Sequence, residues 1–312
     1  MNHASSIPPF PIVADHQLIR CIGLGSYGEV WLASSLLGAY RAVKIVRRCS
    51  FDSSRPYERE INGLRRFEPL SRLGGGLVPI LHVGQDSTAN SLYSVMELAD
   101  PEEPCLTEST NFVSRYQPRT LSSDLGSQIP LPLNVCIEIG LSVAEGLLRL
   151  HSAGLVHRDV KPSNILFVGG RACLADTGLV DAWGKESPHL GTLGYLPPEG
   201  SGLPQADLYG LGKVLYQIAT GLDLAHFPEM PMQWTVLGHQ AHWTFHQTLL
   251  RLGSVDPRRR QGGCIELCAE LRPVLNSLRS QPTDGRRRRW RDCLWRCLKA
   301  PLAHRARRAY GG

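Results

Sequence analysis

The chain lacks several features that would place it in common protein classes. Its 312 residues contain no run of about 18 apolar residues, so no membrane-spanning helix is predicted. The first 15 residues have neither a basic start nor an apolar centre, so no signal peptide is expected. The nine cysteines include no C-x-x-C pair, which is typical of buried free thiols in a reducing compartment. These absences favour a cytoplasmic protein.

Two cysteine pairs have a spacing that allows a second interpretation. Cys264 and Cys268 are four residues apart, as are Cys293 and Cys297. On a helix, each pair would share one face, which is compatible with a metal site. No histidine pattern flanks either pair, however, so free thiols are the simpler interpretation.

Positive charge is concentrated at the C-terminal end. The formal net charge is +6, but the residues from 286 onward hold ten Lys/Arg and one Asp, which leaves about −3 on the first 285 residues. The same tail carries Trp290, Leu294 and Trp295. Three interpretations of this tail stay open: a solvated basic extension, an amphipathic helix that lies peripherally on an anionic membrane surface, and a nucleic-acid contact.

Residues 157–164, with the sequence HRDVKPSN, are far too polar for a core segment. They follow an amphipathic run at 133–151, which predicts a helix ending near Gly154, and they precede an apolar run at 165–168, which predicts a strand. Pro162 excludes a continuous helix, so Asp159 and Asn164 lie on a loop. Phosphoryl transfer requires a carboxylate that accepts a hydroxyl proton beside an amide oxygen that holds a metal.

Three other motifs have chemistry that fits this loop. Residues 23–30 place three glycines before β-prone residues, which favours a Gly-rich hairpin over phosphates rather than a dinucleotide-binding turn. An ordinary Gly-rich turn is the simpler alternative. Lys44 interrupts the apolar strand at 40–46, where an unpaired lysine would be costly to bury. Asp176 follows a short apolar strand and precedes Thr177 and Gly178.

In this order and spacing, the motifs resemble those of the protein kinase superfamily, including the segment GTLGYLPPE at 191–199. Lys161 and Pro162 after the aspartate match the serine/threonine-directed form of the loop. The resemblance covers about residues 12–280. It implies an α+β, two-lobed kinase fold, with a small antiparallel sheet and one helix in the N-lobe and a larger, mostly helical C-lobe.

The resemblance divides the chain into a lead-in at 1–11, an N-lobe at 12–99, a C-lobe at 120–280 and a basic tail at 281–312. Residues 100–119 form an insertion that is longer than the usual link between kinase lobes, and a flap or a partner-contacting loop is open for it. Further strands are expected at 77–84 and 91–99, and further helices at 203–221, 243–252 and 265–278.

The resemblance also implies the roles of the catalytic residues. Lys44 would bind the α- and β-phosphates of ATP and would be held by Glu60 on the following helix. Glu58 is the alternative partner, but Glu60 lies beside the apolar face of that helix. Asp159 would orient the acceptor hydroxyl and take its proton, while Lys161 would contact the γ-phosphate.

ATP and Mg²⁺ are the implied cofactors, with Asn164 and Asp176 as the metal ligands. Main-chain groups of Glu97 and Ala99 would bond the base, and Met96 would line the back of the pocket, although simple core packing explains Met96 equally well. The ATP-binding residues expected by resemblance are Gly23, Leu24, Gly25, Ser26, Tyr27, Gly28, Val30, Ala42, Lys44, Met96, Glu97, Ala99 and Leu166.

Regulation is implied by the arginine that precedes the catalytic aspartate. Arg158 would pair with a phosphate on the activation segment at 176–199, because an arginine guanidinium pairs well with a phosphoryl group. Ser187 is the acceptor expected for that phosphate, because Thr192 is expected to contact the catalytic loop instead.

Three further residues have structural roles by resemblance. Asp207 would brace the catalytic loop, and Glu199 would pair in the interior with Arg260, with an exposed carboxylate at a helix start as the alternative for Glu199. The sequence departs from the family pattern at Pro197, where alanine is usual. It also departs at Thr177, where phenylalanine is usual and would pack between the lobes.

The expected activity is transfer of the ATP γ-phosphoryl group to Ser/Thr hydroxyls of protein substrates, including the chain itself. Three alternatives stay open. A pseudokinase scaffold is supported by Thr177. A small-molecule phosphotransferase of the aminoglycoside type would lack the Pro-Pro-Glu segment and the later arginine. A non-enzymatic adaptor for membranes or nucleic acid depends on the basic tail alone.

Overall fold

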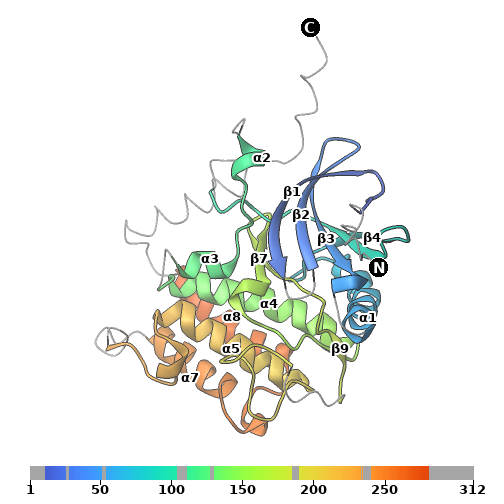
Figure 1. Ribbon diagram of the computed structural model, residues 1–312. Coiled ribbons are helices and arrows are strands. Elements are labelled where there is room, and N and C mark those ends of the chain that lie inside the picture. The colour runs from blue at the N-terminus through green and yellow to red at the C-terminus, as the bar shows by residue number, and fades with distance from the viewer. Residues whose placement is uncertain are drawn as a thin grey trace.

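The computed structural model describes residues 11–25, 28–50, 54–103, 111–126, 130–184, 190–232, 234 and 240–280. These residues form two lobes, with an antiparallel sheet and one long helix in the first and several packed helices in the second (Figure 1). The predicted α+β, two-lobed fold is therefore confirmed. The lead-in at 1–10 and the basic tail at 281–312 lie outside the described residues.

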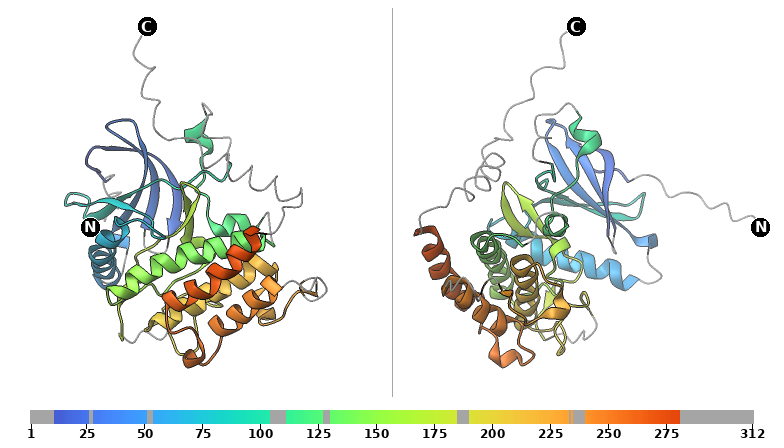
Figure 2. Two further views of the ribbon diagram at one scale, coloured as in Figure 1. Left: turned by 180° about the vertical axis from the view of Figure 1, so that it is seen from behind. Right: turned by 90° about the vertical axis from the view of Figure 1, so that its left-hand side faces the viewer.

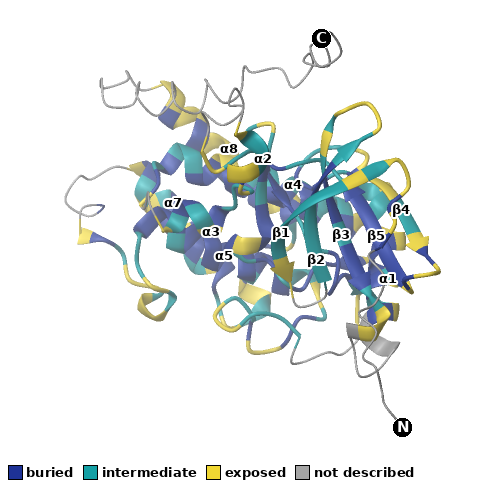
Figure 3. Cartoon of the chain, turned by 45° about the horizontal axis from the view of Figure 1, so that its top comes forward, coloured by how far each residue is buried: buried dark blue, intermediate teal, exposed yellow. Residues whose placement is uncertain are grey.

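The small lobe is built on a five-stranded sheet in which every neighbouring pair is antiparallel. In spatial order its strands are β1 (His16–Gly25), β2 (Gly28–Ser35), β3 (Tyr40–Arg47), β5 (Ser91–Met96) and β4 (Ile80–Asp86). Alternate residues of a strand face opposite sides. Val43 and Ile45 of β3 therefore join a small core on the outer face, while Ala42 and Lys44 face the second lobe. The central strands are accordingly the most buried (Figure 3).

Helix α1 (Ser54–Ser71) follows a 3₁₀ turn at Arg48–Ser50 and joins the sheet to the rest of the molecule. The helix predicted to carry Glu60 is therefore present and extends to Ser71. Leu64 and Phe67 on its inner face are almost fully buried and belong to the same large core as Ile80 of β4. Burial of this apolar face stabilises the helix and offsets the unfavourable helix propensity of Gly63.

A close backbone contact ties the small lobe to the large one just before β4. Gly76 has a φ of +75°, and a Cβ atom there would lie 2.0 Å from the carbonyl oxygen of Ser142 on α4 (Leu133–Ser152). The Leu174 N–H donates to the Gly76 carbonyl at 2.7 Å, and the Val78 N–H donates to the Leu174 carbonyl at 3.0 Å. Only glycine combines this conformation with this approach.

The large lobe is mostly helical, as its apolar periodicity predicts. Its main helices are α3 (Leu121–Leu125), α4, α5 (Pro204–Thr220), α7 (Gln240–Leu252) and α8 (Cys264–Ser280). The helices predicted at 133–151, 203–221, 243–252 and 265–278 are all present with small shifts at their ends. Helix α5 is buried around most of its circumference because its sequence is apolar nearly all round. Figure 2 shows α4, α5 and α8 packed side by side.

Short elements position the loops between the lobes. The strands are β6 (Leu155–Val156), β7 (Ile165–Val168), β8 (Arg171–Leu174) and β9 (Asp181–Ala182), and the 3₁₀ turns are Pro162–Asn164, Leu224–His226 and Pro257–Arg259. Strand β6 pairs with β9, and β7 pairs with β8. The loop with the sequence HRDVKPSN therefore begins at β6, which was not predicted, and ends at β7, which was.

The insertion at 100–119 folds back onto the small lobe, although its residues 104–110 lie outside the described part of the chain. Its two ends lie side by side, because Pro101 and Pro118 form an isolated antiparallel bridge. The short helix α2 (Phe112–Arg115) lies beside the sheet (Figure 2), where the ring of Phe112 stacks on Tyr40 with centroids 4.9 Å apart. The described part of the insertion is thus a flap against β1 and β3.

The cysteines in the described ranges are free thiols. Four of the six, among them Cys264 and Cys268, are buried, as expected. Within these ranges, no group of three or more His, Cys, Asp or Glu side chains is placed to hold a metal ion. Cys293 and Cys297 lie beyond them. Among the described helices, none combines the length and apolar character needed to cross a bilayer.

A buried lysine predicts a pH-dependent contribution to stability. Lys213 of α5 is 8% exposed, with Nζ 3.7 Å from the centroid of the Phe227 ring, and burial lowers its pKa to about 8. Between pH 8 and the ordinary lysine pKa, the unfolded chain holds the proton that folded Lys213 has lost. This residue therefore makes the free energy of unfolding rise with pH there, by up to about 3 kcal/mol.

Chemical unfolding of wild type and Lys213→Met at pH 7 to 10.5 checks this expectation. Lys213→Met should be the more stable variant at pH 7, and its advantage should shrink as the pH rises. A difference between the two proteins that is independent of pH would contradict the assignment.

Candidate active site

The loop between β6 and β7 is held by one buried carboxylate. Asp207, near the start of α5, accepts hydrogen bonds from the backbone N–H groups of His157 and Arg158, both at 2.8 Å. His151 Nε2 lies 2.9 Å from the same carboxylate. Burial raises the pKa of Asp207, but these donors outweigh it and hold the pKa below its ordinary value. Asp207 therefore lies where it was predicted to lie, in contact with the loop at 157–164.

Arg158 lies against a carboxylate of the chain itself. Its φ of +72° is uncommon for a residue with a side chain, and the hydrogen bond from its N–H to Asp207 holds this conformation. Its guanidinium lies 3.7 Å from Asp181 of β9, and Asp181 also accepts from Arg66 of α1 at 2.9 Å. Asp181 thus links α1 to the catalytic loop, a contact that the sequence motifs did not indicate.

Asp159 is the centre of a cluster of polar side chains. Its Oδ2 accepts from Asn164 Nδ2 at 2.9 Å and lies 2.8 Å from Lys161 Nζ. Its Oδ1 accepts from the Thr192 hydroxyl at 2.7 Å, and Lys161 Nζ lies 2.8 Å from that hydroxyl. The structure therefore brings together the predicted residues Asp159, Lys161, Asn164 and Thr192.

Lys44 lies between two carboxylates that come from different parts of the chain. Its Nζ is 2.7 Å from Glu60 Oε1 on α1 and 2.8 Å from Asp176 Oδ1, which follows β8. Burial lowers the pKa of Lys44, but the two carboxylates outweigh it and raise the pKa above its ordinary value. Burial likewise raises the pKa of Asp176, but Lys44 and the Gly178 N–H lower it to about 2. Glu58 is exposed, so Glu60 is the partner.

Thr177 supplies a further hydrogen bond to Glu60. Its hydroxyl donates to Glu60 Oε1 at 3.1 Å, and its side chain is buried. Leu64 and Phe67 of α1 line the same cavity as Thr177. Thr177 in place of the usual phenylalanine therefore exchanges an apolar contact for a hydrogen bond to Glu60, the carboxylate that holds Lys44.

Gly63 allows α1 to approach this segment closely. A Cβ atom at Gly63 would lie 2.4 Å from the carbonyl oxygen of Thr177, which is a severe clash. Because Glu60 lies one turn earlier on α1, the same approach brings its carboxylate to Lys44 and Thr177. Gly63 has a low helix propensity, but the close approach of Thr177 requires a residue without a side chain at this position.

The residues expected to hold a metal have suitable oxygen atoms. Asn164 uses its amide nitrogen to donate to Asp159, so its amide oxygen can face a cation. Asp176 uses Oδ1 for both Lys44 and Gly178, which leaves Oδ2 for another ligand. Amide and carboxylate oxygens are the ligands that Mg²⁺ prefers. The donor set therefore fits a hard divalent cation.

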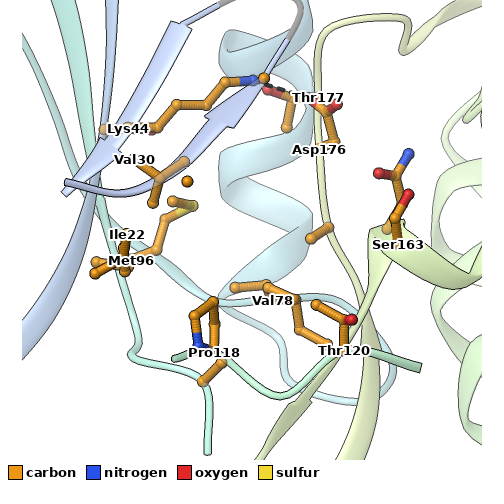
Figure 4. A pocket seen from close by; sticks show the side chains of 18 of the residues that line it. Ile22, Val30, Lys44, Val78, Met96, Pro118, Thr120, Ser163, Asp176 and Thr177 are labelled. Carbon is orange, nitrogen blue, oxygen red and sulfur yellow. Dashed lines mark hydrogen bonds and ion pairs between the residues drawn. The ribbon is translucent and has the colours of Figure 1, made fainter. Parts of the chain in front are cut away.

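These groups open into a cavity of about 420 Å³ between the lobes (Figure 4). Lys44 and Asp176 point toward each other at one end, and Pro118 and Thr120 lie at the opposite end. The predicted ATP-site residues that line it are Gly23, Leu24, Gly25, Gly28, Val30, Ala42, Lys44, Met96, Glu97, Ala99 and Leu166. Ser26 and Tyr27 lie outside the described residues.

Sequence reasoning missed other residues of this cavity. Tyr116 and Pro118 line it from the end of the insertion, Thr120 lines it from the start of α3, and Val78 lines it from the segment before β4. The one signal for Tyr116 was an aromatic residue near the end of a polar insertion, two positions before a proline.

An ion pair between buried Arg260 and the more exposed Glu199 holds the end of the activation segment. The side chain of Arg260 is 0% exposed, and its guanidinium contacts both oxygens of Glu199, with Arg260 Nη2 3.0 Å from Glu199 Oε2. Arg260 also donates to the Gln205 carbonyl at 3.0 Å. The structure thus joins the predicted pair, but only the Arg260 side chain lies in the interior, because Glu199 is exposed. Ser187 lies outside the described residues, so the structure gives no position for it.

Comparison with known proteins matches residues 16–248 to the model of the protein kinase domain. The chain belongs to the protein kinase family. The kinase resemblance predicted from the motifs is therefore confirmed.

Individual relatives are named as serine/threonine kinases. The DNA damage-responsive serine/threonine-protein kinase RqkA of Deinococcus radiodurans is 31% identical over 220 residues, covering 66% of this chain and 30% of the relative. PknL of Mycobacterium tuberculosis is 41% identical over 112 residues, covering 33% of this chain and 28% of the relative. A probable receptor-like serine/threonine-protein kinase of Arabidopsis thaliana is 27% identical over 286 residues, covering 82% of this chain and 60% of the relative.

The chain spans less than a third of the length of the bacterial relatives just named. The kinase domain is thus what this chain shares with them.

The hydrogen bond from Thr177 to Glu60 predicts different effects for two conservative substitutions. Thr177→Val keeps the shape but removes the donor, so it should lower the free energy of unfolding by about 1–2 kcal/mol, because a buried carboxylate loses a hydrogen bond. Thr177→Ser keeps the hydroxyl and is the matched control. Denaturant unfolding of the three proteins measures the difference, and equal stability of the valine variant and wild type would refute this role.

Proposed function

We propose that this chain is a protein serine/threonine kinase that transfers the γ-phosphoryl group of ATP to Ser/Thr hydroxyls. The observation that carries the proposal is the position of two clusters on one cavity. Lys44 with Glu60 and Asp176 forms one cluster, and Asp159 with Lys161, Asn164 and Thr192 forms the other.

The chemistry assigned to each residue follows from its charge and position. Bound ATP supplies the phosphoryl group, and Mg²⁺ offsets the charge that develops on it. Lys44 orients the phosphates, and the two carboxylates beside it hold its ammonium in place. Asp159 accepts the proton of the substrate hydroxyl and orients it for attack.

Asn164, Asp176 and Lys161 have supporting roles in this proposal. Asn164 and Asp176 are the proposed ligands of Mg²⁺, through oxygen atoms that the protein leaves for them. Lys161 reaches the Asp159 carboxylate at 2.8 Å, so its ammonium is available to a γ-phosphoryl group that approaches Asp159. Such preorganised charges can stabilise the transition state with little rearrangement.

Two alternatives are less well supported. A pseudokinase scaffold was suggested by Thr177, but this residue bonds Glu60 and leaves the Lys44–Glu60 ion pair at 2.7 Å. An aminoglycoside-type phosphotransferase is disfavoured by the ion pair between Glu199 and Arg260, because both residues belong to the protein kinase pattern.

Partners and location are proposals as well. We propose protein substrates, including the chain itself, a cytoplasmic location and a role in signalling. Contact of the basic tail with an anionic membrane surface or with nucleic acid stays a prediction, supported by the ten Lys/Arg from residue 286 onward. Deletion of residues 286–312 tests it, because an unchanged location in the cell would contradict a targeting role.

Transfer of radiolabelled phosphate from ATP, to the chain itself and to a generic basic protein, tests the proposed activity. Asp159→Asn should reduce the rate by about 10²- to 10⁴-fold, because the asparagine cannot take the proton. Asp256→Asn, at the cap of the turn Pro257–Arg259, is the matched control and should retain the rate. Labelling should require Mg²⁺ and appear on Ser/Thr. Equal labelling by wild type and Asp159→Asn would overturn the enzymatic function.

Phosphorylation of Ser187 is a separate prediction, based on the arginine beside the catalytic aspartate. Arg158 already lies 3.7 Å from Asp181, so a phosphate on the activation segment would share this guanidinium with a carboxylate. We expect mass spectrometry of the active protein to find a phosphate on Ser187, and Ser187→Ala to lower the transfer rate. An unmodified Ser187 in fully active protein would contradict the prediction.

A further inference from the structure

Near its end, the insertion carries a tyrosine that reaches the segment connecting the two lobes. Tyr116 is fully buried and lines the cavity, and its hydroxyl donates to the carbonyl oxygen of Ala99 at 2.9 Å. Ala99 is one of the two residues whose main-chain groups are expected to bond the base of ATP. The side chain thus acts on the edge of the pocket that recognises the nucleotide.

The peptide bond after Ala99 is fixed at both of its polar atoms. The Ala99 carbonyl accepts from Tyr116, and the N–H of the same peptide unit, that of Asp100, donates to the Phe167 carbonyl at 2.7 Å. The Asp100 carboxylate accepts in turn from the N–H groups of Gly169 and Gly170 at 2.9 and 2.7 Å. This peptide is therefore clamped between the insertion and the turn between β7 and β8.

Tyr116 is itself held from the small lobe. Its backbone N–H donates to the Phe112 carbonyl at 2.8 Å, and its ring lies 5.2 Å from the Phe112 ring. The Arg20 guanidinium of β1 donates to the carbonyls of Val113, at 3.2 Å, and Tyr116. Burial raises the pKa of the Tyr116 phenol, so the hydroxyl remains a donor throughout the physiological range.

We propose that Tyr116 is a specificity-determining residue of the nucleotide pocket. Its hydroxyl donates to the Ala99 carbonyl and so prevents that carbonyl from accepting a hydrogen bond from the base. The inference rests on the proposed binding of ATP. Two main-chain groups then read the base, the Glu97 carbonyl and the Ala99 N–H. The Ala99 N–H donates no hydrogen bond to the described residues, so it is available to a ligand.

Adenine is complementary to these two groups. Its 6-amino group donates and the neighbouring N1 accepts, which matches a carbonyl followed by an N–H. A purine with an additional amino group at C2 presents a second donor, next to N1, on the side of the Ala99 carbonyl. In this protein that carbonyl already has a donor, and the buried Tyr116 side chain fills the space beside it. The 2-amino group therefore gains no partner.

Binding of two diphosphates measured by titration calorimetry tests this inference without turnover. The probes are ADP and 2-aminoadenosine 5′-diphosphate, each with MgCl₂. Wild type should bind the two with affinities within about twofold of each other. Tyr116→Phe should bind the 2-amino analogue about five- to tenfold more tightly relative to ADP, because the freed carbonyl accepts its amino group.

Tyr93→Phe is the matched control, because it removes a tyrosine hydroxyl on the outer face of the same sheet, where Tyr93 packs in the small core. It should show the wild-type ratio of affinities. A wild-type protein that already prefers the 2-amino analogue fivefold would overturn the inference even if Tyr116→Phe failed to fold. An unchanged ratio in folded Tyr116→Phe would overturn it as well.

The same experiment separates this inference from the proposed function. If wild type bound neither diphosphate, the ATP-dependent function would fail and the inference would fail with it. If wild type bound ADP and the Tyr116→Phe ratio stayed unchanged, the inference alone would fail, and the proposed kinase activity would stand.

Discussion

The position of the small lobe depends on one lysine between two carboxylates. Lys44 belongs to the sheet, Glu60 to α1 and Asp176 to the segment after β8, and their side chains meet within 2.8 Å. If α1 or this segment moved away, a buried charge would lose its partner, which is strongly destabilising. Electrostatics therefore fixes the geometry between sheet, helix and large lobe, and the apolar core around Leu64 and Phe67 supports that geometry.

Buried charges in the large lobe follow the same rule, each with several donors or acceptors. Asp207 takes two backbone N–H groups and His151, and Arg260 takes Glu199 and three backbone carbonyls. In both cases the partner is a loop that carries site residues. The same hydrogen bonds therefore pair the buried charge and hold the loop in place. Losing them would leave an unpaired ion in the core, which costs several kcal/mol.

The elements and the principal site residues were predictable because their signals are local. Apolar periodicity placed the helix at 133–151, and the position of Glu60 beside an apolar face favoured it over Glu58. What escaped prediction depends on approaches between distant segments. Thr177 and Glu60 are 117 positions apart, and the need for Gly63 appears only when Thr177 is beside it. The roles of Tyr116 and Asp181 likewise depend on tertiary packing that no motif encodes.

The two ends of the insertion at 100–119 are paired by backbone hydrogen bonds. Because the Glu102 N–H donates to the Gln117 carbonyl at 2.9 Å and the Arg119 N–H donates to the Asp100 carbonyl at 2.8 Å, the chain leaves and re-enters the fold at one place. This backbone pairing fixes the two ends of the insertion against each other, and it thereby holds Tyr116 and Pro118 at the cavity that they line.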